Sequence, residues 1–551
     1  MRPYSPALCL LLAAAPHHLS AQVPEWAWAR SGVGLEYDEA ITVATDPLGN
    51  VIVAGNFTSG SITFGDIILQ NNTPGDDDLY VVKYDPEGNV TWARSAGGAL
   101  DDKADAVTTD AAGNVYLAGN FYSPTISFGD IPLTNAGNVG DVCLVKYDPA
   151  GTVLWATRGG GAGLEIPHAI AVDPGNNVIV AGRFSSNEAI FGSTTLLQAG
   201  SMDVFVVKYD ANGNVLWATG AGGGSNDEAQ AVAVDAAGDI IVAGYYTQEA
   251  DFGTTTLPNP GLANIFLAKC DGVDGTFLWA ESTAADGDER ALAIDLDAQD
   301  NIFVAGFFAS DELTFGSTTL INSGINNGFV ARYNNVGEAQ WAQGLNGRSK
   351  VQGIALANDA VYACGFFNDS PLNYGPDELT VQGGSDLFVL KSDLAGNAQW
   401  VAKQGSGGES GESAMAIAAD AGGHLVIAGR FDSDEVTFGS AQLTISDGFD
   451  MFVLRMGDPD VGIVDAAGMG PVSLYPNPGA GPFVLEGLTG VRTIEISNSM
   501  GAVVLTQRIP AAQERIMVDL DGLPAGHYQL TASGEGRTVV TKLVLLGGVG
   551  R

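Results

Sequence analysis

Hydrophobic and polar residues alternate in short runs along the chain, and the same order of runs recurs seven times. In the first copy, Ala40-Ile-Thr-Val-Ala-Thr45 alternates with a period of two, Asp46-Pro-Leu-Gly-Asn50 has turn composition, and Val51-Ile-Val-Ala-Gly55 returns. Residues 78–94 repeat this order of run, turn and run. Asp and Pro favour the start of such turns, while Gly and Asn tolerate positive φ. Each copy therefore predicts two hairpins, and so four antiparallel strands.

Residues at fixed positions mark every copy. The second strand ends in Gly55, Gly119, Gly182, Gly244, Gly306, Gly365 or Gly429. The third strand ends in a base, at Lys83, Lys146, Lys208, Lys269, Arg332, Lys391 or Arg455. The fourth strand carries a tryptophan, and Trp92, Trp155, Trp217, Trp279, Trp341 and Trp400 are spaced 59 to 63 residues apart. A further segment between the second and third strands, such as 62–69, predicts an extra hairpin on one rim.

An offset of one strand predicts how the copies close into a ring. Only six Trp strands follow the seven basic strands, and the missing one lies on the N-terminal side, where Trp28-Ala-Arg-Ser31 matches Trp92-Ala-Arg-Ser95. The first strand can therefore complete the last blade and remove both open sheet edges. The sequence predicts an all-β protein, with a seven-bladed β-propeller over residues 22–456 that the N-terminal strand closes.

The two ends of the chain depart from the repeat. Residues 1–21 have the pattern of a secretory signal peptide, with an early arginine, an apolar stretch and the small-residue site Leu19-Ser-Ala21. No other segment approaches the roughly 18 consecutive apolar residues that a membrane helix needs. A linker at 457–470 leads into short alternating strands over 471–551, which predict a small β-sandwich.

The formal net charge of −40 limits the partners. With 24 basic against 64 acidic residues, no basic stripe is present that could displace counterions from nucleic acid, and anionic membranes are disfavoured for the same reason. This acidity suits a soluble extracellular protein. Outside the signal segment the chain has three cysteines, an odd number that indicates small buried side chains and not disulfides, at Cys143, Cys270 and Cys364.

Acidic residues recur at the starts of two strands. Before the first strand stand Asp38, Asp102, Glu165, Asp227, Glu289 and Glu412. Before the third strand stand Asp78, Asp141, Asp203, Asn264, Asn327, Asp386 and Asp450. Features of every blade are expected to serve folding, so these carboxylates beside recurring bases predict intrablade ion pairs or turn caps. A ring of calcium sites is the alternative, and the nearest match to a calcium loop is Asp295-x-Asp297-x-x-Asp300, which lacks the third-ligand spacing and the glycine.

Residues that break the repeat are the candidate binding residues. Repeat six has Arg348-Ser-Lys350 near the place where other copies have an acid, and two bases in an acidic ring could attract an anionic ligand. Drift in a tolerant loop is the alternative explanation. The repeated tryptophans are expected to pack between neighbouring blades, whereas Trp26 precedes the repeat register and is a candidate for stacking on a sugar.

No catalytic residue is predicted. The chain has no Gly-x-Ser-x-Gly motif, and its glycine clusters do not fit a phosphate-binding loop that precedes a helix. Outside the signal segment there are three histidines, and His168 is interpreted as an ordinary strand-edge residue while His424 and His527 are interpreted as structural.

The repeat resembles a bacterial family. Val-x-Val-Ala-Gly, Phe-Gly, Asp-x-Phe-Val-x-Lys-Tyr-Asp and Gly-Asn-Val-x-Trp-Ala recur in register over about 26–456 and are similar to the SBBP repeat. This resemblance implies a secreted β-propeller. It implies no activity, because propellers host enzymes and binding platforms alike.

The C-terminal segment resembles a type A C-terminal sorting domain of the type IX secretion system of Bacteroidetes. The residues that carry the resemblance are Tyr475, Pro476, Asn477 and Pro478 at its start, Leu523, Pro524, Gly526 and Tyr528 at a strand entry, and Lys542 in the last strand. The resemblance implies handling by that secretion machinery. It also implies that the protein is secreted, extracellular or attached to the outer-membrane surface.

Together these features favour a non-catalytic binding module for polysaccharide or a surface protein. One alternative is a polysaccharide hydrolase or lyase, for which asymmetric Asp, Glu, His or Tyr residues would converge at one end of the channel. Another is a structural spacer in a surface layer. No cofactor is required by any of these functions, although calcium remains an option for the carboxylates.

Overall fold

The structure is a computed structural model of the whole chain. It describes residues 26–457, apart from 138, 284, 376, 407–410 and 446–447, and parts of 473–545. The predicted signal peptide at 1–21 lies outside the described residues, as does nearly all of the predicted linker at 457–470.

Within the described residues, the repeat region forms seven antiparallel groups of four strands, and the last group takes its outer strand from the N-terminal side. In the third group, Gly222 and Gly223 pair in addition with Asp251 and Ala250 of the next repeat, so that this sheet has six strands. The groups are β2 (Asp38–Thr45), β3 (Val51–Phe57), β6 (Asp78–Tyr84) and β7 (Val90–Ala96); β8 (Asp102–Thr109), β9 (Val115–Phe121), β12 (Asp141–Tyr147) and β13 (Val153–Gly159); β14 (Glu165–Val172), β15 (Val178–Phe184), β18 (Asp203–Tyr209) and β19 (Val215–Gly223); β20 (Asp227–Val234), β21 (Ile240–Tyr246), β24 (Asn264–Cys270) and β25 (Phe277–Thr283); β26 (Arg290–Leu296), β27 (Ile302–Phe308), β30 (Asn327–Tyr333) and β31 (Ala339–Leu345); β32 (Ser349–Ala357), β33 (Ala360–Phe367), β36 (Asp386–Asp393) and β37 (Ala398–Gln404); and β38 (Glu412–Ala419), β39 (Leu425–Phe431), β42 (Asp450–Met456) and β1 (Trp26–Ser31).

The last of these sheets contains strands from both sides of the repeat region. β1 pairs antiparallel with β42, so that Trp28 is opposite Arg455 and Ala29 is opposite Leu454. The pairing has the register of the equivalent strands in the first sheet, where Trp92 is opposite Lys83. The N-terminal strand that the sequence matched to the missing Trp strand therefore completes the last sheet.

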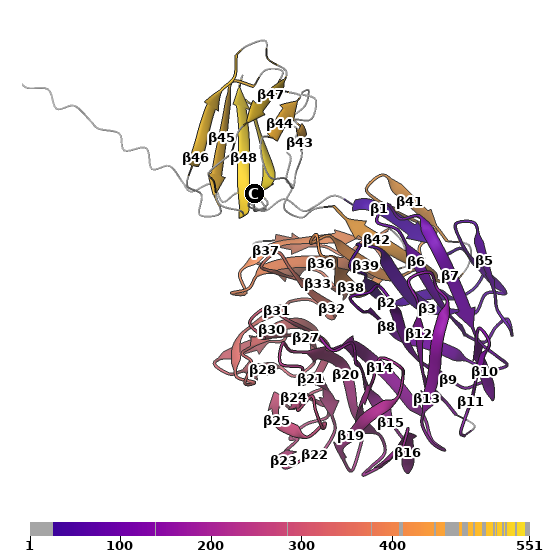
Figure 1. Cartoon of the computed structure of the whole chain (residues 1–551). Coiled ribbons are helices and arrows are strands. Elements are labelled where there is room, and N and C mark those ends of the chain that lie inside the picture. The colour runs from indigo at the N-terminus through magenta and orange to yellow at the C-terminus, as the bar shows by residue number, and fades with distance from the viewer. Residues whose placement is uncertain are drawn as a thin grey trace, which may run out of the picture.

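The first strands of the sheets lie around one axis, and we call β2, β8, β14, β20, β26, β32 and β38 the inner strands. Each inner strand contacts the inner strands of both neighbouring sheets, and β38 contacts β2. Figure 1 shows most of them towards the middle, with β7, β13, β25 and β37 farther out. Sheets of four antiparallel strands around an axis define a β-propeller, which confirms the all-β propeller fold.

The extra segment of each repeat forms a short hairpin, as predicted. These hairpins are β4 (Ser61–Phe64) with β5 (Ile67–Gln70), β10 (Thr125–Phe128) with β11 (Ile131–Thr134), β16 (Glu188–Phe191) with β17 (Thr194–Leu197), β22 (Ala250–Phe252) with β23 (Thr255–Leu257), β28 (Glu312–Phe315) with β29 (Thr318–Ile321), β34 (Leu372–Tyr374) with β35 (Asp377–Leu379), and β40 (Glu435–Phe438) with β41 (Ala441–Thr444). Phe64, Phe128 and Phe191 at their turns are buried in the cores of the repeats. Burial of these rings holds each hairpin against its blade.

Neighbouring repeats are joined by a contact that we call the inter-repeat latch. In it, the base that ends the third strand and the tryptophan of the fourth strand donate to one backbone carbonyl in the second turn of the next repeat. Five junctions of the described chain have this contact, and the shared acceptor is Pro149, Ala211, Gly272, Leu394 or Pro86. The expected packing of the tryptophans between blades thus includes a hydrogen bond.

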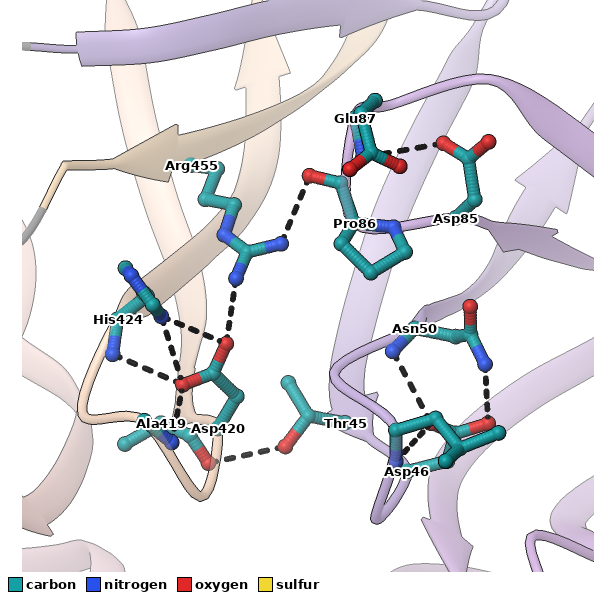
Figure 2. A network of polar contacts seen from close by, with 12 residues as sticks. Thr45, Asp46, Asn50, Asp85, Pro86, Glu87, Ala419, Asp420, His424 and Arg455 are labelled. Carbon is teal, nitrogen blue, oxygen red and sulfur yellow. Dashed lines mark hydrogen bonds and ion pairs between the residues drawn. The ribbon is translucent and has the colours of Figure 1, made fainter. Parts of the chain in front are cut away.

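In six repeats of the described chain, the base that ends the third strand also forms an ion pair with an acid of its own repeat. Arg455 pairs with Asp420 at 2.5 Å and donates to Pro86 O at 2.8 Å, as Figure 2 shows. Lys208 pairs in the same way with Asp173 at 2.8 Å. The acid is therefore the first residue of the first hairpin turn. The acids that precede the first and third strands, for which the sequence predicted ion pairs or turn caps, lie at the opposite ends of these strands from the recurring base and the turn acid. Two of them form intrablade ion pairs with other bases, Asp141 with Arg158 and Asp386 with Lys403. Asp78 and Asp102 accept hydrogen bonds from backbone amides, as caps do. The prediction is confirmed for these acids, whereas the recurring base pairs with the turn acid.

The C-terminal part contains two antiparallel sheets. One is formed by β43 (Ser473–Tyr475), β44 (Phe483–Glu486) and β47 (Arg515–Val518), and the other by β46 (Val503–Arg508), β45 (Thr493–Asn498), β48 (Gly526–Gly534) and β49 (Arg537–Leu545). Phe483 and Val518 of the first sheet share a core with Ile494 and Leu530 of the second. Two sheets around one core agree with the predicted small sandwich.

Two further expectations concern the whole described chain. Cys143, Cys270 and Cys364 are buried and free, as predicted for small core side chains. In the part of the chain that the structure describes, no helix is long and apolar enough to cross a membrane.

Replacing Lys208 with methionine is expected to lower the free energy of unfolding by about 3–5 kcal/mol, because it leaves the buried Asp173 without its partner. Chemical denaturation monitored by fluorescence would measure this change. Lys103→Met is the matched control, since Lys103 is 39% exposed and its pair with Asp77 is expected to contribute at most about 1 kcal/mol. Equal losses of unfolding free energy in the two variants would contradict a stabilising role for the buried ion pair of the latch.

Candidate functional site

Every inner strand contains a β-bulge near its start. The residue without a partner in the ladder is Ile41, Asp105, His168, Gln230, Leu292, Gln352 or Met415. A bulge takes its extra residue out of the regular alternation and re-aims the side chain. Because these residues differ in size, polarity and charge, the repeats are least alike at this level of the ring.

Five side chains from repeats three, four and five come together beside one bulge, and we call His168, Arg183, Glu228, Tyr245 and Arg290 the inner cluster. Arg183 Nη1 donates to Glu228 Oε1 at 2.6 Å, and His168 Nε2 lies 3.4 Å from Glu228 Oε2. Tyr245 is the cross-strand neighbour of Glu228, and the Arg290 guanidinium lies 4.1 Å from the centroid of the Tyr245 ring. The cluster thus joins acidic, basic and aromatic groups across two repeat interfaces.

Glu228 is the charged centre of the inner cluster. Its residue is 6% exposed, and burial alone would raise its pKa. Contacts with His168 and Tyr245 and the charges of His168 and Arg183 outweigh burial and lower the pKa of Glu228 to about 2. The carboxylate is therefore ionised at neutral pH and holds the basic side chains in place.

A pocket of about 320 Å³ adjoins the inner cluster in repeats five and six, and we call it the repeat-six pocket. It is lined by Asp288, Phe307, Arg348, Lys350 and Phe366, among others. Asp288 also binds Arg290 of the inner cluster, with 2.7 Å between Oδ1 and Nε. Both bases that the sequence selected as binding candidates therefore line one cavity.

The two bases of the repeat-six pocket have aromatic surroundings and lack acidic partners. The Lys350 ammonium lies 4.2 Å from the centroid of the Phe307 ring. Burial lowers the pKa of Lys350, and the charges of Arg290 and Arg348 lower it further against the effect of Asp288. Within the described chain, the side chains of Arg348 and Lys350 form no ion pair and no hydrogen bond.

Trp26, the third binding candidate, lies in β1 away from these groups. Its ring is half-buried and meets Phe438 edge-on, with 5.6 Å between the ring centroids. The contact fastens β1 to the hairpin of repeat seven.

The three candidate metal ligands bind separate partners. Asp295 accepts hydrogen bonds from the backbone amides of Leu296 and Leu356. Asp297 caps its own turn and lies 3.4 Å from Arg332, as the acid of the latch. Asp300 accepts from the amide of Ala236. Among the residues that the structure describes, no group of three or more His, Cys, Asp or Glu side chains is arranged to hold a metal ion.

The predicted sorting residues lie in the C-terminal sheets or outside the described residues. Tyr475 ends β43, Gly526 and Tyr528 lie in β48, and the backbone of Lys542 in β49 pairs with Gln529. Leu523 packs against the sandwich core and Tyr528 is buried in it. The remaining residues, Pro476, Asn477, Pro478 and Pro524, are not among those described.

The inner cluster was not found from the sequence. His168 was interpreted as a strand-edge residue, because periodicity alone does not reveal a bulge. A usable signal existed in Arg183, which replaces the asparagine of repeats one and two, Asn56 and Asn120, at the same strand position. Repeat seven also has a base at this position, Arg430, which pairs with Glu39, so the base alone does not distinguish the inner cluster.

The fold defines the repeat region as a β-propeller, and two further sheets follow it on the C-terminal side. Residues 473–546 match the family described as "Secretion system C-terminal sorting domain". The chain therefore carries a sorting domain of the type IX secretion system at its C-terminal side, and the protein is exported to the cell surface or secreted.

Two curated proteins are similar to part of this chain. An uncharacterized WD repeat-containing protein of Acanthamoeba polyphaga mimivirus is 25% identical over an alignment of 416 residues that covers 61% of this chain and 30% of that protein. The regulatory protein FlaEY of Caulobacter vibrioides is 22% identical over an alignment of 316 residues that covers 53% of this chain and 33% of that protein. The chain thus spans about a third of the length of these relatives.

Two solved structures are similar to this chain at low identity. Sqt1 from Chaetomium thermophilum matches 77% of this chain and 99% of its own, with 11% identity and a TM-score of 0.36. The Pan2 WD40 domain of Neurospora crassa matches 79% of this chain and 98% of its own, with 10% identity and a TM-score of 0.37.

Glu228→Gln is expected to lower the free energy of unfolding by roughly 2 kcal/mol at pH 7, because Arg183 and His168 lose a charged partner. The folded-state pKa of about 2 lies below the ordinary value of 4.5, so this stabilisation is complete above pH 4.5 and is lost as pH falls towards 2. Denaturation of both proteins from pH 7 to pH 3 would measure it. The control is Glu39→Gln in the partly exposed Glu39–Arg430 pair, and a pH-independent effect at Glu228 would contradict the assignment.

Proposed function

We propose that this protein is an exported binding module that holds an anionic polysaccharide, or an acidic surface of another surface protein, without catalysis. The ligand would lie over the repeat-six pocket and the adjoining inner cluster. The observation that carries the proposal is the pair of bases without acidic partners, Arg348 and Lys350, in a chain with a net charge of −40. In so acidic a protein, a base is expected to find a carboxylate unless it serves another partner.

The aromatic surroundings support a sugar acid as ligand. Phe307 lies under Lys350 and Phe366 lines the same cavity. A cation and an aromatic face side by side suit a sugar ring that bears a carboxylate or sulfate, because the ring packs on the apolar face while the anion meets the base. A binding role for repeat six is favoured over neutral drift because both bases face one cavity.

The same proposal includes a closed ring of seven blades. Its support is the pairing of β1 with β42, the contact of β38 with β2, and the latch from Arg455 to Pro86. It also includes an SBBP type of repeat, a type A sorting domain, a Bacteroidetes origin and an N-terminal signal peptide at 1–21. The sorting domain would be recognised by the type IX machinery after the signal peptide has directed export.

The inner cluster favours one further function, that of a polysaccharide hydrolase or lyase. His168, Glu228 and Tyr245 converge asymmetrically, and such convergence of titratable groups is typical of an active site. The strong pairing of Glu228 with Arg183 argues for a positioning role, because a pKa of about 2 makes a poor proton donor. A structural spacer would need neither the pocket nor the cluster.

Replacing both Arg348 and Lys350 with alanine is expected to weaken binding to polygalacturonate at least tenfold, since each charge-assisted contact contributes about 1.5–3 kcal/mol. Affinity electrophoresis of the full chain would measure retention, and mass spectrometry would detect any shortened products. Dextran, which is neutral, is expected to give no retention.

Lys103→Ala is the matched control, because Lys103 occupies the position of Lys350 in repeat two but is paired with Asp77 at 2.8 Å. It is expected to retain the wild-type affinity. Equal loss in both variants, or no retention of the wild type by any acidic polysaccharide, would contradict the polysaccharide proposal. New oligosaccharides would favour an enzyme.

Deleting 26–31 is expected to lower the melting temperature by about 10 °C or more and to cause aggregation, because β42 loses its partner and becomes an open edge. Differential scanning calorimetry and light scattering would measure both effects. Replacing 26–31 with the matching residues of β7 is the control and is expected to preserve stability, since both strands share the Trp-Ala-Arg-Ser sequence. A deletion variant as stable as the wild type would contradict closure.

A further inference from the structure

Residues of two repeats meet at each boundary on the rim where the inner strands start, and we call each set of four a junction patch. One repeat contributes the residue before its third strand and the next-to-last residue of its second strand. The next repeat contributes the residue before its inner strand and the second residue of that strand. The three patches that matter here are Asn326, Phe307, Arg348 and Lys350 between repeats five and six; Ser385, Phe366, Gly411 and Ser413 between six and seven; and Phe449, Arg430, Tyr37 and Glu39 between seven and one.

Backbone contacts hold the two halves of each patch together. Ser349 N donates to Asn326 O at 3.2 Å, and Asp38 N donates to Phe449 O at 2.8 Å. Between repeats six and seven, residues 385 and 411 form a β-bridge. Residues at equivalent positions of different patches can therefore be compared directly.

A base covers the aromatic ring at two successive boundaries. The Lys350 ammonium lies 4.2 Å from the centroid of the Phe307 ring, and the Arg290 guanidinium lies 4.1 Å from the centroid of the Tyr245 ring at the preceding boundary. In both contacts the ring belongs to one repeat and the base to the next. Such a cation–π contact takes up one face of the ring. Phe307 is therefore closed to a ligand on the side where Lys350 lies.

The patch between repeats six and seven has a ring and no base. Phe366 has the position of Phe307, but Ser413 has the position of Lys350, and the other two members are small. Phe366 is partly exposed and lines the repeat-six pocket. Within the described chain, no cation and no other aromatic ring stacks on it. The ring of Phe366 thus offers an open face beside the two bases of the pocket.

The patch between repeats seven and one presents an exposed ring. Tyr37 is 59% exposed, and its ring meets that of Phe449 at a tilt of 39°, with 5.6 Å between the centroids. Its backbone is fixed by Thr58, whose Oγ1 accepts from Tyr37 N at 3.0 Å and whose amide donates to Tyr37 O at 2.9 Å. Arg430 is neutralised by Glu39 at 2.8 Å. The patch therefore supplies aromatic surface and not charge.

The three patches follow one another along one rim. Arg348 and Tyr37 even share a position, directly before the inner strand of their repeats. A linear ligand along this rim meets two bases, then Phe366, then Tyr37. Sugar rings pack on aromatic faces, and their acidic groups bind bases. A single terminal sugar reaches only part of this surface, whereas a chain of sugars can make all of these contacts.

We propose that the ligand is an extended acidic polysaccharide chain that crosses these three junction patches, and not a single terminal sugar. Arg348 and Lys350 bind an acidic group of the chain, while Phe366 and Tyr37 stack on two of its sugar rings. Phe366 and Tyr37 are thereby the residues that select for chain length. This inference rests on the proposed binding function and adds the form of the ligand and its path over the protein.

The test measures binding of trigalacturonate and dodecagalacturonate to the full chain by isothermal titration calorimetry. Tyr37→Ala is expected to weaken binding of the dodecamer about fivefold, because one stacking contact is lost. It is expected to leave the affinity for the trimer unchanged, because Tyr37 lies two boundaries away from the bases. Phe366→Ala is expected to weaken binding of both ligands, because Phe366 borders the pocket that holds the bases.

Two control variants separate stacking from other effects. Tyr37→Phe keeps the ring and is expected to bind both ligands as the wild type does. Leu100→Ala changes a residue that is 45% exposed on the same rim in repeat two, and it is also expected to have no effect. Unchanged dodecamer affinity in Tyr37→Ala, or an equal loss for trimer and dodecamer, would overturn the extended path and leave the proposed function intact. A wild type that binds neither ligand would contradict the proposed function itself.

Discussion

The inter-repeat latch fixes the distance between neighbouring blades at the five junctions where it is present. A sheet of four strands buries little by itself, so a repeat is stable only when it packs against the next one. The latch joins the two repeats with one carbonyl, one indole and one base whose charge is balanced by an acid of its own repeat, as in Arg455 with Asp420 and Pro86. A hydrogen bond in a dry interface tolerates little displacement. The latch therefore fixes the distance between neighbouring blades, whatever the sequences of the connecting loops.

Because the ion pairs of the third strands are structural, the bases outside them are the ones that can indicate a binding site. Seven of the 24 basic residues end third strands, and those with a turn acid are neutralised within the repeat. The other bases are free to differ between repeats. Arg183 pairs with Glu228 and Arg290 pairs with Asp288, whereas within the described chain Arg348 and Lys350 line a pocket with aromatic residues and form no ion pair. The acids of the structural ion pairs thus follow the ends of the inner strands, whereas Arg348 and Lys350 lie at the start of one of them, β32.

Much of the fold followed from the repeat itself, because seven copies in register average out local ambiguity. The hairpins, the extra hairpin and the pairing of Trp28 with Arg455 were all visible as spacing. The site was less visible. Arg348 and Lys350 stood out as departures from the repeat, but Asp46 was interpreted only as turn chemistry, so its ion pair with Lys83 was missed. His168 is the bulge residue of its strand, and Glu228 belongs to the next repeat. Neither the bulge nor the contact between repeats can be recognised from the alternation of hydrophobic and polar residues.

The pairing of β1 with β42 has a consequence for the time course of folding. Gly32 N donates to Met451 Sδ across 419 residues of sequence, so the contact requires closure of nearly the whole repeat region. Such non-local contacts are slow to form, since the entropy of a long loop is lost before the contact is gained. The other sheets can assemble from neighbouring segments, whereas the sheet that β1 and β42 share needs strands from both sides of the repeat region. Formation of that sheet is therefore expected to be a late step of folding.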